Sequence, residues 1–473
     1  MHSFLCSHLF EPCYVGCMGV SAQRVQPVEV AVLASRWAIR EGATEAEAYV
    51  VHARGYQVRI LAGKIEGLQS NDDVGIGIRV AVGKKIGFAY TTGLDLENMR
   101  RAVRAAVKQA KVAPEDPEWQ GLPEPSQSYP EPGNMYSPEL AAASAETVIE
   151  HVREIFSIAG EYEGVSVARG SVSVERIERA IVNTNGVYRV DVGTVAATLV
   201  GVNARKNGVL TPVVFDFEVS RVSMPSAEVL VRRVVDRVLQ ATKLAKGVET
   251  GKYTVVLAPS VFEELLGVTV LYSLRGDIYV QGRSYYGDKV GEQALSEKIT
   301  IIDDGTLKGG DNTWRFDGEG VATSRKVLVE KGVVKGFVFD NYWGRRAGNA
   351  STGNAVRIGY SSMPIPGFTN VVVEPGDALM EELFEGKVLV VYQVQGAHTA
   401  NSETGEYSVL ANPAIYFENG EPKGWVRGAM ISGNFYRELR DNVELLGKTV
   451  ERAGFGRYAP WIRLSGITVA VKA

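Results

Sequence analysis

The sequence predicts an α+β protein, in which N-terminal α/β layers of antiparallel strands and helices precede a large β-rich antiparallel sheet or half-barrel. Three observations lead to this prediction. The 473 residues are enough for about three domains of roughly 150 residues each. A helix, alternating strands and a second helix are indicated twice before residue 250. Beyond Gly276, hairpin signals recur at short intervals with little helical pattern.

The composition excludes several kinds of site. The chain carries 51 Lys and Arg against 55 Asp and Glu, a net charge of -4, which argues against a predominantly nucleic-acid-binding surface. All three cysteines lie within the first 17 residues, and only five histidines are present: Cys6, Cys13, Cys17, His2, His8, His52, His151 and His398. From Met18 onward, the sequence therefore has no means of forming a disulfide, a Cys-rich zinc module or a cysteine nucleophile.

Residues 1–24 are expected to form a disordered extension. The spacing of Cys6, Cys13 and Cys17 could in principle hold a metal but matches no common zinc pattern. We favour a disordered or mis-assigned extension ahead of an alternative start at Met18. The segment lacks the basic start and the uninterrupted apolar run of a secretory signal. No stretch of about 18 apolar residues could span a membrane, so we expect a cytoplasmic protein.

The first predicted domain covers residues 25–113. Helical periodicity indicates a helix over residues 25–41, and Asp95 begins a second amphipathic helix that runs to about residue 112. Between them, glycines separate four β-rich segments at residues 48–52, 56–61, 74–82 and 85–90. Gly75-x-Gly77 lies inside one of these strands with no helix after it, so it fails the context of a dinucleotide fingerprint.

A connector is predicted over residues 114–138, because seven of the 18 prolines fall there and prevent a regular hydrogen-bond ladder. The central domain then covers residues 139–250. It should begin with a helix at 139–160 and end with one at 227–246, with strands at 165–174, 176–183, 187–200 and 209–219. Asn185-Gly186 predicts a tight hairpin between the second and third of these strands.

The third domain, residues 251–473, begins with an apolar run at 253–258 that is typical of a buried strand. A helix starting at Pro259 should carry apolar residues toward the core as far as Leu274. The β-rich remainder favours a large antiparallel sheet or half-barrel in which loops line a cleft. Two carboxylate pairs have local explanations, since Asp303-Asp304 precedes Gly305 in a turn signal and Glu263-Glu264 lies early in the helix.

Nine short segments of the third domain resemble, in the same order over about 160 residues, the TldD/PmbA family of metalloproteases once named modulators of DNA gyrase. The segments are Leu274–Asp277, Gly282–Ser284, Lys289–Glu292, Ile301–Thr306, Ser351–Ala355, Thr369–Asp377, Thr404–Ser408, Phe417–Glu421 and Ile431–Asn434. The resemblance extends to the layout of the N-terminal units and covers nearly everything after about Val25.

The resemblance also implies what this chain lacks. The TldD branch carries His-Glu-x-x-x-His shortly before a Gly-Asp pair, together with a late cysteine, and these are taken as zinc ligands and general base. Alignment on Gly276-Asp277 places Gly267, Val268 and Tyr272 at the three motif positions, and residues 446–473 contain no cysteine. The chain therefore resembles the PmbA/TldE branch, and zinc is expected only in a TldD-like partner.

This resemblance implies a non-catalytic, metal-free subunit of a cytoplasmic metalloprotease that processes unfolded peptides. The chain would form a heterodimer with a TldD-like subunit, or a homodimer in its absence, and would hold extended peptides by strand addition. The shared loops supply candidate cleft or peptide-binding residues: Arg283, Ser284, Thr352, Gly353, Asn354 and His398. Alternatively, these motifs preserve turn geometry, and His398 is a solvated loop residue.

Two other functions remain open from the sequence. One is a hydrolase with a non-zinc mechanism, for which Asp303, Asp304 and Ser284 are the first candidates. The other is a regulator that binds DNA gyrase or another protein. Neither a membrane nor direct contact with nucleic acid is expected.

Overall fold

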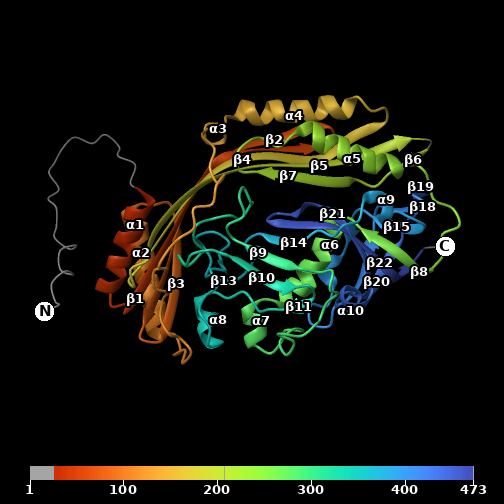
Figure 1. Cartoon of the computed structure of the whole chain (residues 1–473). Coiled ribbons are helices and arrows are strands. Elements are labelled where there is room, and N and C mark those ends of the chain that lie inside the picture. The colour runs from red at the N-terminus through yellow and green to blue at the C-terminus, as the bar shows by residue number, and fades with distance from the viewer. Residues whose placement is uncertain (1–25, 207, 472–473) are drawn as a thin grey trace.

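The computed structural model describes residues 26–206 and 208–471 of the chain. The predicted extension over residues 1–24, with Cys6, Cys13 and Cys17, lies outside the described residues. Within them the protein is an α+β structure built on two main sheets, most of whose strands pair antiparallel, as the sequence predicts (Figure 1). No helix among the described residues is long and apolar enough to cross a membrane.

The N-terminal sheet contains strands from both of the predicted N-terminal units. In the order β3-β2-β1-β4-β5-β6, with β7 also paired to β5, each strand runs antiparallel to its neighbours. Pairing of β1 with β4, from Glu47 opposite Asn183 to Leu61 opposite Arg169, joins the two halves. The strands are β1 Glu45–Leu61, β2 Lys64–Val82, β3 Lys85–Thr92, β4 Val165–Asn183, β5 Tyr188–Lys206, β6 Val209–Leu210 and β7 Val214–Ser220.

Helices cover the outer face of this sheet in two groups (Figure 1). Helices α1 (Pro27–Arg40) and α2 (Leu96–Val112) share one core with β1 and β2, and α4 (Ala145–Gly160) and α5 (Ala227–Gln240) share another with β4 and β5. In α5 the buried residues recur at helical spacing: Leu230, Val231, Val234, Val235 and Val238. Burial of this apolar face accounts for the position of the helix against the sheet.

Several predicted elements differ in extent from the observed ones. The strands expected at residues 48–52 and 56–61 form the single strand β1. The helix expected at residues 139–160 is interrupted, because α3 ends at Ala141 and Ser144 caps α4. The final helix of the central unit ends at Gln240, and residues 241–246 continue as turn and bridge.

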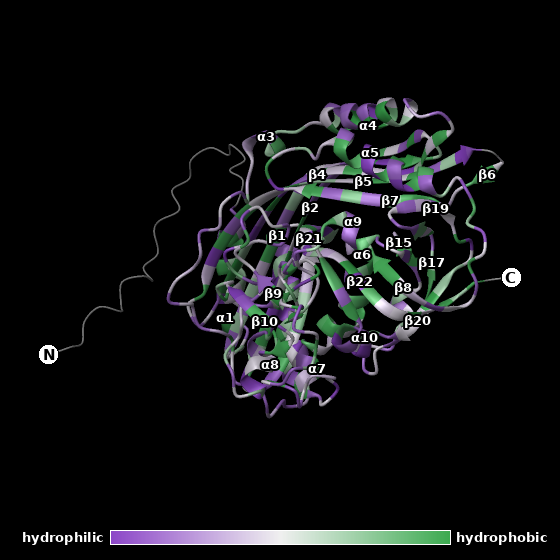
Figure 2. Ribbon diagram, turned by 45° about the vertical axis from the view of Figure 1, so that its right-hand side comes forward, coloured by the Kyte–Doolittle hydropathy of each residue, from purple (hydrophilic) through white to green (hydrophobic). Residues whose placement is uncertain are grey.

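The C-terminal region forms the second sheet, which has 13 strands within the described residues. Its apolar strands β8 and β22 and helix α6 contribute to the largest core (Figure 2). Its elements are β8 Gly251–Leu257, α6 Pro259–Leu266, η1 Gly267–Leu271, α7 Gly276–Val280, β9 Ile301–Asp304, β10 Arg325–Glu330, β11 Val333–Val334, α8 Asn341–Arg346, β14 Val371–Val373, α9 Met380–Leu383, β15 Lys387–Val391, β16 Val394–Gln395, η2 Ala397–Thr399, β17 Glu406–Ala411, β18 Ala414–Glu418, β19 Glu421–Trp425, β20 Met430–Asn434, α10 Phe435–Asp441, β21 Val443–Gly454 and β22 Arg457–Ala470. Separately, β12 (Ala355–Val356) pairs only with β13 (Ile365–Pro366) among these strands.

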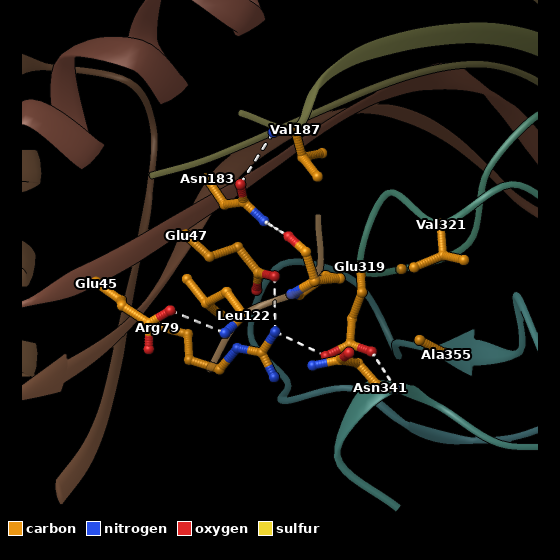
Figure 3. Close-up of polar contacts among 12 residues, drawn as sticks. Glu45, Glu47, Arg79, Leu122, Asn183, Val187, Glu319, Val321, Asn341 and Ala355 are labelled. Atoms are coloured by element: carbon orange, nitrogen blue, oxygen red, sulfur yellow. Dashed lines mark hydrogen bonds and ion pairs between the residues drawn. The ribbon is translucent and has the colours of Figure 1, made fainter. Parts of the chain in front are cut away.

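A buried ionic cluster joins the N-terminal sheet to the C-terminal region. Arg79 on β2 donates to Glu47 on β1 and to Glu319, both at 2.7 Å, and the three side chains are at most 3% exposed. Figure 3 shows Arg79 between these carboxylates, with Asn341 donating its backbone N–H to Glu319 at 2.8 Å. Burial opposes ionisation of Glu47, yet the Arg79 and Arg357 guanidiniums hold its pKa below the usual value. The cluster fixes how the curved sheet faces the C-terminal region.

Candidate functional site

The candidate site is a cleft of about 520 Å³ in the C-terminal region. Helix α6 and the π-helical turn η1 form one wall, and β13, the loop after η2 and the start of β22 form the others. Its lining residues are Glu263, Gly267, Val268, Leu271, Tyr272, Arg275, Asn312, Val356, Ile365, Pro366, Gly367, Phe368, His398, Ser402 and Arg457. Gly267, Val268 and Tyr272, which the sequence resemblance aligns with the zinc motif, therefore all line this cleft.

The π-helical turn explains why two of those positions share a face. In an α-helix, residues five apart point about 140° away from each other. A π-helical turn closes hydrogen bonds five residues apart, so residues with that separation lie on the same side of the helix. The chain is π-helical over Gly267–Leu271, and both Gly267 and Tyr272 line the cleft. The helix predicted to run from Pro259 to Leu274 thus contains a local change of helix type at the site.

Two arginines of the cleft lining form ion pairs, Arg275 with Asp277 at 2.6 Å and Arg457 with Glu263. Arg457 Nε lies 3.4 Å from Glu263 Oε1, and the two side chains are 20% and 18% exposed. Burial raises the pKa of Glu263 despite the nearby Arg457, and burial likewise lowers the pKa of Arg457. The Arg457 guanidinium also lies over the Phe368 ring at 5.6 Å. A partly desolvated charge pair beside apolar walls can bind the backbone of an extended ligand.

Two of the predicted candidates lie at the cleft. His398, on the short helix η2, is an exposed lining residue. The Arg283 guanidinium lies 5.9 Å from the centre of the Tyr272 ring. It also forms an ion pair with Glu403 at 2.8 Å, and both of these side chains are half exposed to solvent. Arg283 thus lies beside the cleft without lining it.

Gly353 and Asn354 line an adjoining cavity of about 160 Å³, which shares Asn312, Val356 and Phe368 with the cleft. Gly353 has a φ of +71°, and an added Cβ would lie 2.3 Å from the Ala322 carbonyl oxygen. Only glycine suits this backbone position. Asn354 is fully buried and donates to Asp303 Oδ2 and to the Gly367 carbonyl oxygen, each at 2.8 Å.

Thr352 lines a third hollow, while Ser284 lines none of the three described here. Thr352 Oγ1 accepts from the Phe339 backbone N–H at 2.8 Å. Ser284 Oγ donates to the Ser273 carbonyl oxygen at 2.6 Å and accepts from the Tyr286 backbone N–H.

The paired aspartates have different surroundings. Asp303 is fully buried, accepts hydrogen bonds from Asn354 and Thr369, and forms an ion pair with Lys326 at 3.3 Å. Asp304 accepts from the backbone N–H and the hydroxyl of Thr306 in a turn. Each carboxylate thus already serves the local structure.

The donor atoms at the cleft do not fit a hydrolytic zinc site. Such a site takes three protein ligands, usually imidazole or carboxylate, and leaves one position for water. Gly267 and Val268 offer no side-chain donor, and His398 is the one imidazole in the cleft lining. Within residues 26–206 and 208–471, no three His, Cys, Asp or Glu side chains are grouped so that they could hold a metal ion.

The sequence did not identify all residues of the cleft. Glu263 was explained by the helix dipole alone, whereas it lies within α6 and pairs with Arg457 from β22, 194 positions later. Asn312 and Phe368 lie in irregular segments whose sequences carry no motif. For Glu263 and Arg457, the available signal was a charged residue within an otherwise apolar stretch.

Comparison with known proteins places these features in a family. Three family models match: PmbA/TldA metallopeptidase domain 1 over residues 46–110, its central domain over 138–242 and its C-terminal domain over 250–471. An uncharacterized protein of Methanocaldococcus jannaschii is 30% identical over 416 residues, covering 86% of this chain and 93% of that protein. A metalloprotease TldD homolog of Haemophilus influenzae is 25% identical over 437 residues, covering 84% and 86% of the two chains.

A solved structure gives the same result. The crystal structure of TldE from Thermococcus kodakarensis superposes with a TM-score of 0.87 at 29% identity, covering 93% of this chain and all of that chain. The resemblance first indicated by nine short segments therefore extends over all three parts of the fold. The chain belongs to the PmbA/TldD metallopeptidase family.

Proposed function

We propose that this chain is the metal-free, non-catalytic subunit of a TldD/TldE-type peptidase, and that its cleft binds extended, unfolded peptides. The observation that carries the proposal is the set of side chains at the zinc-motif positions. Gly267, Val268 and Tyr272 keep the cleft open and lined by apolar groups, yet they offer no set of metal ligands. A partner carrying His-Glu-x-x-x-His would supply the zinc and the hydrolysis.

Peptide binding is supported by the walls of the cleft. Strands β12 and β13 contribute Val356, Ile365 and Pro366 to the lining, and this short hairpin pairs with no other strand in the described part of the chain. The backbone N–H and carbonyl oxygen of Ala355 on β12 are already hydrogen-bonded, so an extended segment would add at the β13 edge through main-chain hydrogen bonds. The pair of Glu263 on α6 and Arg457 on β22 then offers an acceptor and a donor to the same ligand. On this proposal the complex is cytoplasmic, and a homodimer forms where the partner is absent.

A cleft-filling substitution tests the binding site. Gly267 has helical dihedrals, with φ at -61° and ψ at -47°, and an added Cβ would meet only Glu263 Oε1, at 3.4 Å. Gly267→Leu should therefore fold, and its free energy of unfolding should rise by about 1 kcal/mol because glycine is a poor helix former. Its side chain would occupy the cleft and weaken the binding of fluorescein-labelled casein fragments, measured by fluorescence anisotropy.

The matched control is Gly160→Leu, which makes the same change at the end of α4, where no atom lies within 4 Å of the added Cβ. Equal binding by the two variants would contradict the assignment of the cleft.

Metal analysis tests the other half of the proposal, that the chain is metal-free and non-catalytic. Stoichiometric zinc in the purified chain, with chelator-sensitive cleavage of casein by that chain alone, would overturn it.

The partner is tested by mixing. A TldD-like chain from the same genome should cleave the casein fragments faster when this chain is added in equal amount, and the two chains should co-elute in size-exclusion chromatography. Gly267→Leu should retain co-elution and lose part of the stimulation. Separate elution, with no change in cleavage rate, would contradict the role as a subunit.

A further inference from the structure

A smaller cavity of about 160 Å³ lies beside the cleft. Four aromatic side chains and two arginines contribute to its lining: Tyr49, Trp314, Phe316, Phe368, Arg179 and Arg357. The engineered cavity that holds benzene is of similar size, about 150 Å³. The space therefore suits one small group of a ligand, and its three residues in common with the cleft place that group next to a peptide bound there.

The two arginines of this cavity differ in their partners. Arg357 donates to Glu47, to the Gly318 carbonyl oxygen and to the Ser362 carbonyl oxygen, so its charge and its donors are satisfied. Arg179, on β4, is 9% exposed. It donates from Nη2 to the Phe316 carbonyl oxygen, and its buried Nε has no hydrogen-bond partner.

Arg179 also has no counter-ion in the described part of the chain. The carboxylate of Asp191, opposite Arg179 on β5, accepts from Arg315 Nε at 2.8 Å instead. Asp317, which also lines the cavity, accepts three backbone N–H groups: those of Glu319, Val321 and Ala355. Stacking of the Arg179 guanidinium on Trp314 at 4.1 Å and on Phe316 at 4.7 Å offsets part of the cost of burying it.

A second buried cation increases the local positive charge. Arg221 is 1% exposed, lies 4.7 Å from the Trp314 ring and donates to five backbone carbonyl oxygens without an ion pair among the described residues. Arg221 does not line the cavity, whereas Arg179 does. A buried guanidinium that lacks a counter-ion and has a like-charged neighbour favours an anion in the adjoining space.

We infer that this cavity is a subsite for a carboxylate of the peptide held in the neighbouring cleft, with Arg179 as the residue that recognises it. The inference rests on the proposed peptide-binding function. The aromatic walls contact the carbon atoms that carry the carboxylate, and the Arg179 guanidinium, which lines the cavity, donates to its oxygens. The carboxylate belongs either to the C-terminus of the peptide or to an acidic side chain, since both present the same group.

The first experiment uses a small probe that does not depend on peptide binding. Butyrate reproduces the end of a glutamate side chain, and butyramide is its neutral counterpart. At equal ionic strength, butyrate should raise the melting temperature of the full-length protein and butyramide should not. Arg179→Met should abolish the butyrate effect. Arg189→Met is the matched control, because Arg189 also stacks on a ring and has a buried, unpartnered Nε, yet it lies outside the cavity lining.

The second experiment uses three labelled peptides of one sequence without other acidic residues. One has a free C-terminus, one is amidated with a single internal Glu, and one is amidated with Gln at that position. One of the first two should bind about ten- to a hundredfold more tightly than the third, and Arg179→Met should remove that preference. Whichever carboxylate is preferred identifies its source.

The outcomes separate this inference from the proposed function. Equal binding of all three peptides, or a butyrate effect that survives in Arg179→Met, overturns the carboxylate subsite and leaves peptide binding intact. Failure of every peptide to bind overturns the proposed function, and with it the peptide origin of the carboxylate. If Arg179→Met does not fold, the wild-type comparison of butyrate with butyramide still decides the test, since equal effects contradict a role for charge.

Discussion

Replacing Arg79 by methionine should destabilise the protein far more than the loss of an ordinary ion pair. Arg79 is paired with both Glu47 and Glu319 at 2.7 Å, inside the cluster that joins the N-terminal sheet to the C-terminal region. At an effective dielectric constant of about 20, each contact contributes roughly 6 kcal/mol of attraction. Burying the guanidinium costs several kcal/mol, which offsets part of this gain, and breaking a buried pair leaves a net loss of about 3–5 kcal/mol.

The loss arises mainly from the carboxylate that remains. Glu47 keeps the Arg357 guanidinium, whereas Glu319, which is fully buried, retains only the Asn341 backbone N–H among its hydrogen-bond donors. The double variant Arg79→Met with Glu319→Gln should therefore recover part of the lost stability, since it removes the unpaired charge. The free energy of unfolding is to be measured by urea denaturation, followed by tryptophan fluorescence.

Arg104→Met is the matched control, because it makes the same chemical change in a pair with Glu41 at 2.9 Å whose side chains are 67% and 41% exposed. An exposed pair of this kind contributes about 0.2–1 kcal/mol. If Arg79→Met lowers the free energy of unfolding by no more than Arg104→Met does, burial of the cluster does not determine how much it stabilises the protein, and the reasoning is refuted. A double variant less stable than Arg79→Met alone would refute the role given to Glu319.

Three further predictions concern pH and local geometry. Burial, and then the nearby Glu319, raise the pKa of Asp340 to about 8. Its protonation therefore stabilises the fold fully below pH ~4, the pKa in the unfolded chain, and this stabilisation is lost as the pH rises to about 8. Asp340→Asn should flatten the decline of melting temperature between pH 5 and 8, and an unchanged slope would contradict this. Gly353→Ala should lower the free energy of unfolding by more than the ~1–2 kcal/mol of left-handed strain expected for Gly359→Ala, because only the Cβ at position 353 would clash with backbone. Equal urea midpoints for the two variants would disprove the clash. Ser226→Ala should remove the cap of α5 and lower the free energy of unfolding by about 1 kcal/mol, while Ser226→Asp keeps the wild-type urea midpoint. A lower urea midpoint in both variants would argue against capping.

Local sequence patterns predicted the longer helices well because each has its own apolar face, and α2, α4 and α5 also have a capping side chain. Periodicity placed a helix over residues 25–41, and the structure has α1 at Pro27–Arg40. The glycines of the strands were harder to interpret. Gly55 suggested a break, yet β1 continues through it, because the β4 backbone passes so close that an added Cβ would lie 1.9 Å from the Val174 carbonyl oxygen. That requirement depends on a segment more than a hundred residues away.

The site was predictable where a motif marked it. The family pattern led to Gly267, Val268 and Tyr272, and these do line one cleft. Glu263 and Arg179 could not be identified in this way, because both are distinguished by their burial and their partners. Glu263 pairs with an arginine from a distant strand, whereas the buried Nε of Arg179 has no hydrogen-bond partner. Such properties depend on packing between elements, and no spacing within one segment encodes them.

The π-helical turn at Gly267–Leu271 bears on how the proposed metal-free subunit differs from a zinc-binding partner. The turn places positions 267 and 272 on one face whether or not they carry imidazoles. On the proposed function, loss of the zinc ligands therefore needs only side-chain replacements at these positions, with no change of the backbone. The same backbone offers a short path in the opposite direction, in which an engineered chain with Gly267→His, Val268→Glu and Tyr272→His begins from a surface already shaped for ligands.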